Sequence, residues 1–351
     1  MRGKTVLMAG LSLLILVVPA MTQNGHAAGT YFDHIVIIAM ENKDYSSVLG
    51  NGTGTSAAPF LASMLPYSST IPNYHSYAPQ GGSRDGCSAA CYTEVTSGGS
   101  YGVSDGVGEG SVTATSIFDR ITSAGLTWKG FCESGCGRSG DHYPPLQYAS
   151  TYKSPNSIVT SSDFPGNSQL LSVLNSANPP NYVWLTPTDG HNMHSSSIST
   201  GDTYLKTLLV GSGTLTSPAA DSLLSTNIFR PSERTLLYIW WDEYDPSPNV
   251  EYGPGIARQG YIAPANNYDE YASLHTIVSN WGLSCLAEDC HAPVMSDLFS
   301  ASSPPSSPPG GISLGWIVIG VVLAVVIAAA LVLSVRLRRL RATRASGQSG
   351  C

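Results

Sequence analysis

The chain has 351 residues, of which 42% are hydrophobic and only 12% are charged, and its formal net charge is −7. This size suits one large folded domain or two modest ones. All 24 acidic residues lie between Asp33 and Asp297 with no basic patch among them, which argues against nucleic acid as a partner.

The N-terminus has the pattern of a secretory signal peptide. Arg2 and Lys4 precede an apolar run over residues 6–20 that ends in small side chains. We expect cleavage between Ala20 and Ala28, so that residues 1–28 are removed and residues 29–299 form the exported domain.

A buried strand is predicted over residues 31–40, because residues 35–39 are continuously apolar and rich in β-branched side chains. Polar residues follow at once, beginning with Glu41 and Asn42. In open α/β sheets, ligands bind just beyond the carboxyl ends of such strands. Glu41 and Asn42 are therefore candidate cation ligands.

Six of the seven cysteines form three close pairs, 87/91, 132/136 and 285/290. In an exported protein such pairs favour three disulfides. Six cysteines allow many pairings, so the sequence leaves the connectivity open. Structural zinc is the weaker alternative, since no second Cys/His pair lies at zinc-finger spacing.

Further elements follow in the middle of the chain. A helix over residues 116–124 is predicted to begin with a capping box of Ser116 and Asp119. Short strands are expected over 126–133 and 181–186. A helix is expected over 199–210, with Asp202 in its first turn, where a carboxylate favours the helix dipole.

A second strand with an acidic end is predicted over residues 235–245. Six of its first seven residues are apolar or aromatic, which is typical of a strand buried on both faces. It runs into Asp242, Glu243 and Asp245. Packed carboxylates repel one another unless protons or a metal neutralise them. Two strands that end this way predict one shared cation site, and a solvated acidic turn is the simpler alternative.

The region after Asp245 is rich in Gly and Pro, and only residues 261–263 suggest extended structure. A helix over 271–281 is predicted to pack against the sheet. Residues 300–311 are predicted to form a Pro/Ser stalk, and residues 312–335 are uncharged and long enough to cross a bilayer. The arginine-rich tail, residues 336–351, then predicts a cytoplasmic C-terminus and an extracellular domain.

Five segments together resemble the phosphoesterase family that contains acid phosphatases and phospholipases C. They are HIVIIAMENKDYSSVLG, LLYIWWDEYD and residues 116–133, 186–209 and 267–283, in the family's order. The resemblance covers about residues 34–286. It implies an alkaline-phosphatase-like α/β fold, with a mostly parallel central sheet and helices on both faces.

The resemblance also implies a nucleophile at Ser88. Relatives carry Pro-Ser-x-Pro-Asn-Tyr at this point, whereas here the prolines and Asn are absent and Cys87 and Cys91 flank the serine. A loop closed by cysteines would hold a nucleophile rigidly. An ordinary loop serine is the simpler alternative, and Ser76 and Ser83 are the alternative nucleophiles.

Two histidines match positions that the family uses to bind phosphate. His142 corresponds to the histidine of a His-Asn-Pro motif, and His194 to that of an Asn-Asp-Met-His-Asp motif whose acids are lost here. Glu270 stands where relatives carry another histidine. The secondary candidates are His75, His191, Asp202 and Asp245.

The implied chemistry is metal-dependent hydrolysis of phosphate monoesters through a phosphoserine. Glu41, Asn42, Asp242 and Glu243 would hold a divalent ion, which the sequence does not identify. Phospholipase C activity is one alternative, and a cell-surface binding domain with a decayed site is another. The natural substrate and the oligomeric state stay open.

Overall fold

The computed structural model describes residues 28–75, 87–264 and 267–300. The predicted signal peptide up to residue 27, the stalk beyond residue 300, the predicted span and the basic tail lie outside these residues, as do Ser76 and Ser83. Among the described residues, no helix has both the length and the hydropathy that a membrane crossing requires.

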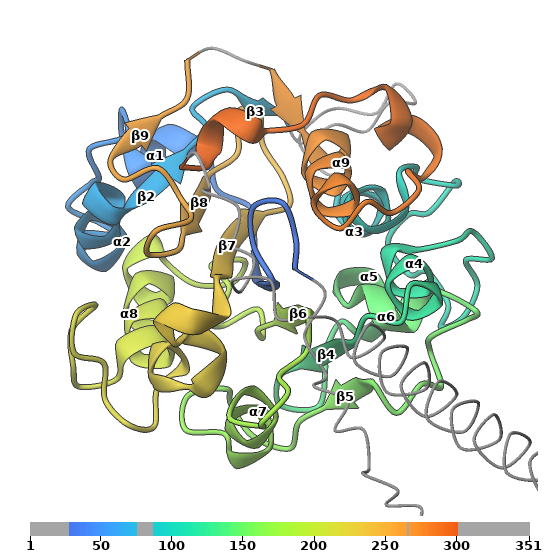
Figure 1. The fold of residues 1–351 in the computed structure, drawn as a ribbon, viewed down its shortest axis with the longest axis horizontal. Helices are drawn as coiled ribbons and strands as arrows, with labels where there is room; N and C mark the ends of the chain where they lie inside the picture. The colour runs from blue at the N-terminus through green and yellow to red at the C-terminus, as the bar shows by residue number, and fades with distance from the viewer. Residues whose placement is uncertain (1–27, 76–86, 265–266, 301–351) are drawn as a thin grey trace, which may run out of the picture. The chain divides into compact units, whose positions relative to one another are not determined.

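An eight-stranded sheet forms the centre of the domain, in the order β5-β4-β6-β1-β7-β8-β2-β9 (Figure 1). Neighbouring strands from β5 to β7 are parallel, while β8 is antiparallel to both β7 and β2. The sheet is therefore mixed but mostly parallel, and the predicted α/β class is confirmed. Its strands are β1 (His34–Met40), β2 (Ser68–Thr70), β4 (Trp128–Cys132), β5 (Ser157–Val159), β6 (Tyr182–Thr186), β7 (Thr235–Trp241), β8 (Asn249–Tyr252) and β9 (Tyr261–Ile262).

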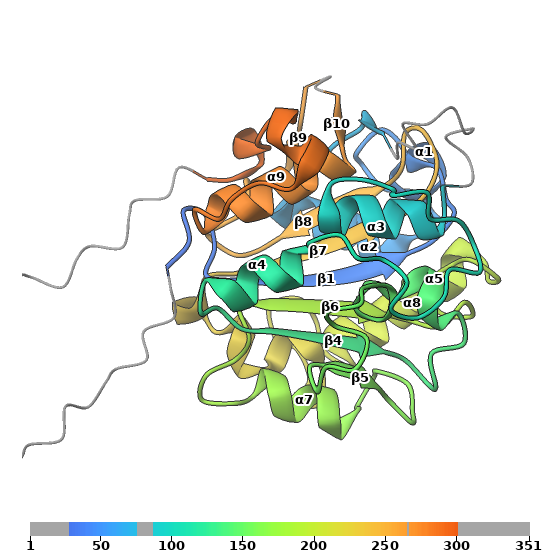
Figure 2. The ribbon, with the colours of Figure 1, turned by 90° about the vertical axis from the view of Figure 1, so that its right-hand side faces the viewer.

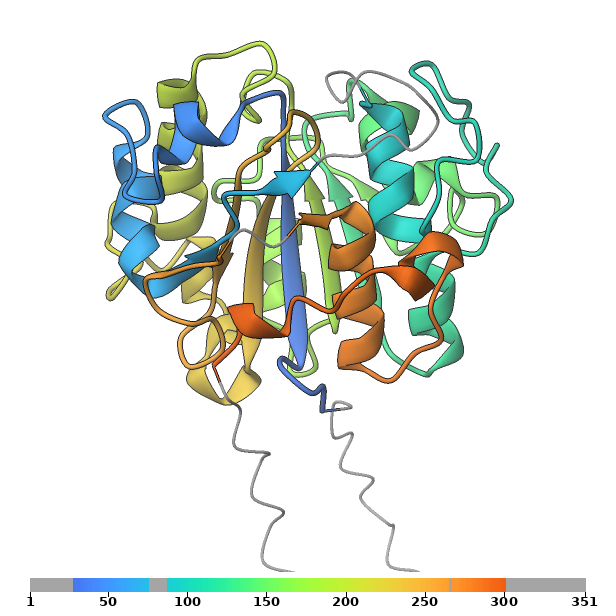
Figure 3. The same cartoon turned by 90° about the horizontal axis from the view of Figure 1, so that it is seen from above.

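Helices cover both faces of the sheet, because alternate residues of β1 belong to two separate cores. Ile35 and Ile37 pack with one helical layer, and Val36 and Ile38 with the other. Figure 2 shows the first layer in front of the stacked strands, and Figure 3 shows the sheet between the two layers. The first layer contains α3 (Ala89–Ser97), α4 (Ile117–Ser123) and α9 (Glu270–Asn280), and the second contains α2 (Pro59–Met64), α7 (Ser168–Leu174) and α8 (Ile198–Val210).

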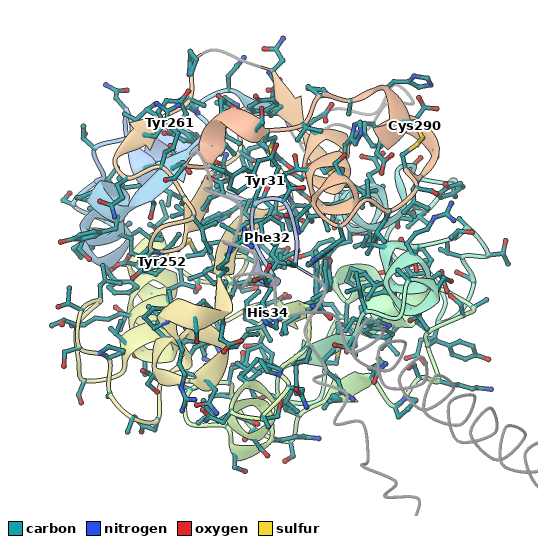
Figure 4. All side chains as sticks on the ribbon, in the orientation of Figure 1. Tyr31, Phe32, His34, Tyr252, Tyr261 and Cys290 are labelled. Carbon is teal, nitrogen blue, oxygen red and sulfur yellow. A yellow bond between two sulfur atoms is a disulfide. The ribbon has the colours of Figure 1, made fainter. Side chains whose placement is uncertain are left out.

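Short elements complete the described domain. They include the helices α1 (Tyr45–Leu49), α5 (Ser139–His142) and α6 (Pro144–Gln147), several one-turn 3-10 helices, and a two-stranded sheet of β3 (Tyr74–His75) and β10 (Tyr268–Asp269). Figure 4 shows His34, the first residue of β1, and Phe32, two residues before it, near the centre of the view, and Cys290 toward its periphery. Phe32 and His34 are completely buried.

Most of the local predictions are confirmed. The capping box of Ser116 and Asp119 is present at the start of α4. The three close cysteine pairs are disulfide-bonded as neighbours, which settles the connectivity that the sequence left open.

The prediction that the region after Asp245 lacks a further strand before residue 261 is wrong. Residues 249–252 form β8, and all four residues are buried. The four residues NVEY do alternate between polar and apolar side chains, but so short a run in a Gly- and Pro-rich segment does not distinguish a strand from a loop. The pairing of β8 with β7 and β2 is what makes it a strand.

Candidate functional site

The tips of β1 and β7 lie side by side. These strands pair in parallel with Met40 opposite Trp241, so the residues that follow emerge together at one edge of the sheet. The backbone N–H of Asn42 donates a hydrogen bond of 3.3 Å to Asp242 Oδ1. The two acidic strand ends of the sequence therefore meet.

Three buried oxygen atoms at these tips have no hydrogen-bond partner among the described residues. They are Glu41 Oε2, Asn42 Oδ1 and Asp242 Oδ2. Burial raises the pKa of Glu41 to about 8, and burial together with the neighbouring Glu41 raises that of Asp242 well above its usual range. A desolvated and unpaired carboxylate costs several kcal/mol. Hard divalent cations prefer oxygen ligands of this kind, so the residues present fit such an ion.

Ser88 faces this group from the start of α3. Its Oγ lies 2.9 Å from His142 Nε2, and its backbone N–H donates to Glu243 Oε1 at 3.1 Å. The disulfide between Cys87 and Cys91 closes the turn around it. Glu243 thus links the tip of β7 to the serine.

Three of the nine non-glycine residues with positive φ among the described residues lie at this site. Asn42, Ser88 and Met193 have φ values of 45°, 39° and 81°, in the left-handed region that side-chain-bearing residues rarely adopt. Such conformations cost of order 1–3 kcal/mol each and are concentrated at functional sites. Only the surrounding structure can hold these three residues in place.

His142 completes a chain of polar contacts from Ser88 to Glu41. Its Nδ1 lies 3.7 Å from Glu41 Oε1, which also accepts a 2.6 Å hydrogen bond from the Tyr92 hydroxyl. Burial, followed by the charge of Arg138, lowers the pKa of His142 to about 3. A neutral ring with its proton on Nδ1 would leave Nε2 as the acceptor for the Ser88 hydroxyl.

A cavity of about 310 Å³ adjoins this chain, with His142 in its wall. Arg138 also lines it, and sequence reasoning did not single out this residue. An isolated arginine in a Gly/Ser-rich loop carries no motif, so no signal in the sequence could have found it. The cavity is lined by residues 132–134, 136–138, 142 and 186–190.

His194 lies at the edge of the same region. Its side chain is 31% exposed, and its Nδ1 lies 3.8 Å from Asp189 Oδ2. The loop that carries it is tied to the tip of β1, since Lys43 Nζ donates to the carbonyl of Met193 at 2.6 Å. The backbone N–H of Glu41 also donates to the carbonyl of Asn192 at 2.8 Å.

His191 belongs to a different cluster. Its Nδ1 lies 2.8 Å from Glu133 Oε2, and its ring stacks on Tyr204. Glu133 also accepts hydrogen bonds from the Tyr204 hydroxyl and from the backbone N–H groups of Phe164 and Thr188. The sequence analysis missed Glu133, which anchors the loop after β6 from the far side of the cavity.

The other secondary candidates lie in contacts of their own. Asp202 accepts hydrogen bonds of 2.9 Å from the backbone N–H groups of Phe60 and Leu61. It therefore caps α2, and the expectation that it serves the dipole of its own helix is corrected. His75 and Asp245 bond to each other beside the β3–β10 pair.

Comparison with known proteins gives a consistent result. The profile described as the Phosphoesterase family matches residues 67–224. The phosphatidylinositol-3-phosphatase of Mycobacterium tuberculosis is 26% identical over 306 residues, which cover 82% of this chain and 90% of that protein.

Solved structures share the fold at low identity. The lipoteichoic acid synthase LtaP from Listeria monocytogenes has a TM-score of 0.50 at 11% identity, over 74% of this chain and 73% of that one. A protein in the alkaline phosphatase superfamily from Vibrio parahaemolyticus has a TM-score of 0.48 at 11% identity, over 76% and 72%. The chain is therefore similar to the phosphoesterase family of phosphate-ester hydrolases over residues 67–224, and it shares the α/β fold of LtaP.

Proposed function

We propose that this protein is an exported, metal-dependent phosphatase that hydrolyses phosphate monoesters through a phosphoserine at Ser88. The observation that supports this most is the 2.9 Å contact of Ser88 Oγ with His142 Nε2. It lies beside the buried, unpartnered oxygens of Glu41, Asn42 and Asp242.

Glu41, Asn42 and Asp242 would hold the divalent ion, with Glu243 as a further ligand or as the support of Ser88. Such an ion supplies Lewis-acid stabilisation of phosphoryl oxygens and lowers the pKa of a nearby hydroxyl. The choice between Mg, Ca, Mn, Zn and Fe is left to metal analysis, since oxygen ligands and a nearby imidazole suit several of them.

The chain's own side chains would move the protons. His142 Nε2 accepts the Ser88 proton as Oγ forms a bond to phosphorus and the bond from phosphorus to the ester oxygen breaks. His194, at the edge of the cavity, protonates the departing oxygen so that an alcohol leaves. Water then attacks phosphorus and gives a proton to His194, the bond between phosphorus and Ser88 Oγ breaks, Oγ regains its proton from His142 Nε2, and inorganic phosphate is released.

The substrate is proposed to be a monoester because of the relative described above. The name of that relative describes the removal of a 3-phosphate, which is a monoester, and the relative matches this chain over most of both lengths. Phospholipase C activity is the second candidate, favoured by the predicted membrane anchor. The signal-peptide pattern and the uncharged run over 312–335 support a single-pass protein whose catalytic domain is extracellular.

The test is turnover of p-nitrophenyl phosphate by the Ser88→Ala variant, with each divalent metal in turn. We expect kcat to fall by roughly 10⁴-fold, as for the loss of other enzyme nucleophiles. Ser284→Ala is the matched control, since Ser284 is an exposed serine beside the Cys285–Cys290 disulfide. Wild-type turnover by Ser88→Ala would remove this serine from the mechanism. A wild-type protein without turnover under any of these conditions would favour a binding domain.

A further inference from the structure

Arg138 occupies a central position in the cavity beside His142. It stands at the N-cap of α5 (Ser139–His142), so the same short helix carries both residues. Its side chain is 26% exposed and lines the cavity of about 310 Å³. A cation is thus presented to the space next to Ser88.

The guanidinium of Arg138 is surrounded by acids but closely paired with none. Its Nη1 lies 4.0 Å from Glu41 Oε2 and 3.9 Å from Asp189 Oδ2. Its Nη2 lies 3.5 Å from Asp105 Oδ2. These distances are too long for charge-assisted hydrogen bonds, and buried Nη1 has no hydrogen-bond partner among the described residues.

Arg234 shows what a structural arginine looks like in the same protein. Its Nη1 donates to Asp33 Oδ1 at 2.9 Å, and its Nη2 to the carbonyl of Tyr31 at 2.8 Å. Arg138 has no such bonds at Nη1. A planar guanidinium with open donors fits the oxygens of a phosphoryl group.

The surrounding acids do not compete strongly with such a ligand. Under the proposed function Glu41 shares its charge with the divalent ion. Asp105 and Asp189 are 55% and 33% exposed, so solvent screens their attraction for Arg138. Arg138 is then the strongest anion-binding side chain in the wall of this cavity.

We propose that Arg138 binds an unesterified oxygen of the substrate's phosphoryl group and thereby selects phosphate monoesters over diesters. The inference rests on the proposed function. A monoester carries three unesterified oxygens and up to two negative charges, whereas a diester carries two oxygens and one charge. In a diester, the group facing Arg138 would be a neutral ester arm, which offers no charged oxygen to accept a hydrogen bond from the buried N–H.

The experiment compares p-nitrophenyl phosphate with bis(p-nitrophenyl) phosphate, using the metal-loaded full chain. For Arg138→Gln we expect kcat/KM for the monoester to fall about 100-fold, as when one transition-state hydrogen-bond donor is lost. The diester should lose less than about fivefold, so the selectivity ratio collapses. Arg138→Lys keeps the positive charge but not the planar pair of N–H donors, so its selectivity ratio should lie between those of the wild type and Arg138→Gln. Arg258→Gln is the control, because that guanidinium lies over the Tyr261 ring and donates to the carbonyl of Asp297.

A second readout does not require turnover. Calorimetry should show inorganic phosphate binding to the metal-loaded wild type, and binding at least tenfold weaker to Arg138→Gln. Equal losses for both esters, or unchanged phosphate affinity in a variant that melts like the wild type, would overturn the inference. If the wild type turned over neither ester, the proposed function would fail, and phosphate affinity alone would decide whether Arg138 binds the anion.

Discussion

Two groups of buried carboxylates lie in this domain, and they differ in what surrounds them. Glu41 and Asp242 lie at the tips of β1 and β7, next to Asn42 and facing Ser88. Glu94 and Glu270 lie between α3 and α9, where ligand atoms of these two residues and Cys91 fall within 4.8 Å of one another. In both groups, burial of an ionised carboxylate away from water costs free energy unless a proton, a cation or a hydrogen bond compensates it.

The two groups differ in the atoms that accompany their carboxyls. Both groups contain carboxylate oxygens without a hydrogen-bond partner among the described residues, and burial raises the pKa of carboxyls in both. The strand tips add the neutral amide oxygen of Asn42 and face Ser88, so they suit a cation. In the helical group Cys91 is tied up in a disulfide, and burial raises the pKa of Glu94 to about 9, so a proton neutralises this carboxyl. Burial of acids alone is therefore no sign of a metal. The donor set and the nearby nucleophile distinguish the two groups.

The largest effect should come from Asp242→Asn, which keeps the shape of the strand tip but removes a charge from the cation site. We expect turnover of a phosphomonoester to fall by about 10³-fold or more, because transition-state stabilisation by the site is lost. Metal content per protein, measured by mass spectrometry, should fall with it. Glu94→Gln is the matched control and should keep both metal and turnover. Full metal content in Asp242→Asn would contradict the assignment of the metal to the strand tips.

The disulfide between Cys87 and Cys91 connects the two groups, since Cys87 adjoins Ser88 and Cys91 adjoins Glu94. Replacing both cysteines by serine should lower kcat by roughly 10–100-fold, because the turn that holds the nucleophile loosens. The same change at Cys285 and Cys290 should leave kcat unaltered. Equal losses in the two double variants would show that the disulfides only support the fold.

Glu94→Gln should stabilise the protein at neutral pH. The pKa of Glu94 is raised from 4.5 to about 9, so the folded state holds a proton that the unfolded state releases. The contribution of Glu94 to stability is therefore fully present below pH about 4.5 and is lost as the pH rises toward about 9. At pH 7 the gain should be roughly 3 kcal/mol in the free energy of unfolding. Urea titrations from pH 5 to 9 measure it, and a difference that does not grow with pH contradicts the protonated state.

The smallest effect is a change in melting temperature on adding a divalent ion. A ligand that binds only the folded state at about 100 times its Kd stabilises by about 2.7 kcal/mol, which is a few degrees for a domain of this size. The shift should occur in the wild type and in Glu94→Gln, and should be absent in Asp242→Asn. A shift that disappears in Glu94→Gln instead would place the ion between α3 and α9.

The sequence predicted the parts of the site that depend on local pattern. The apolar runs of β1 and β7 and the polar residues after them are short-range signals, and parallel pairing brings their ends together. The resemblance placed Ser88 and His142 as candidates, and the structure puts them in contact. Their roles stay predictions until the variants above are measured.

Only the tertiary structure decided the rest, because the contacts join residues far apart in the chain. Arg138 lies within 4.0 Å of Glu41, Asp189 and Asp105, which come from three separate segments. The sequence around Arg138 contains no motif that predicts these contacts. Asp202 caps a helix that lies about 140 residues earlier in the chain. A pattern of apolar residues can specify which face of a strand or helix is buried. The partner of a single polar side chain depends on how the packed elements bring distant loops together.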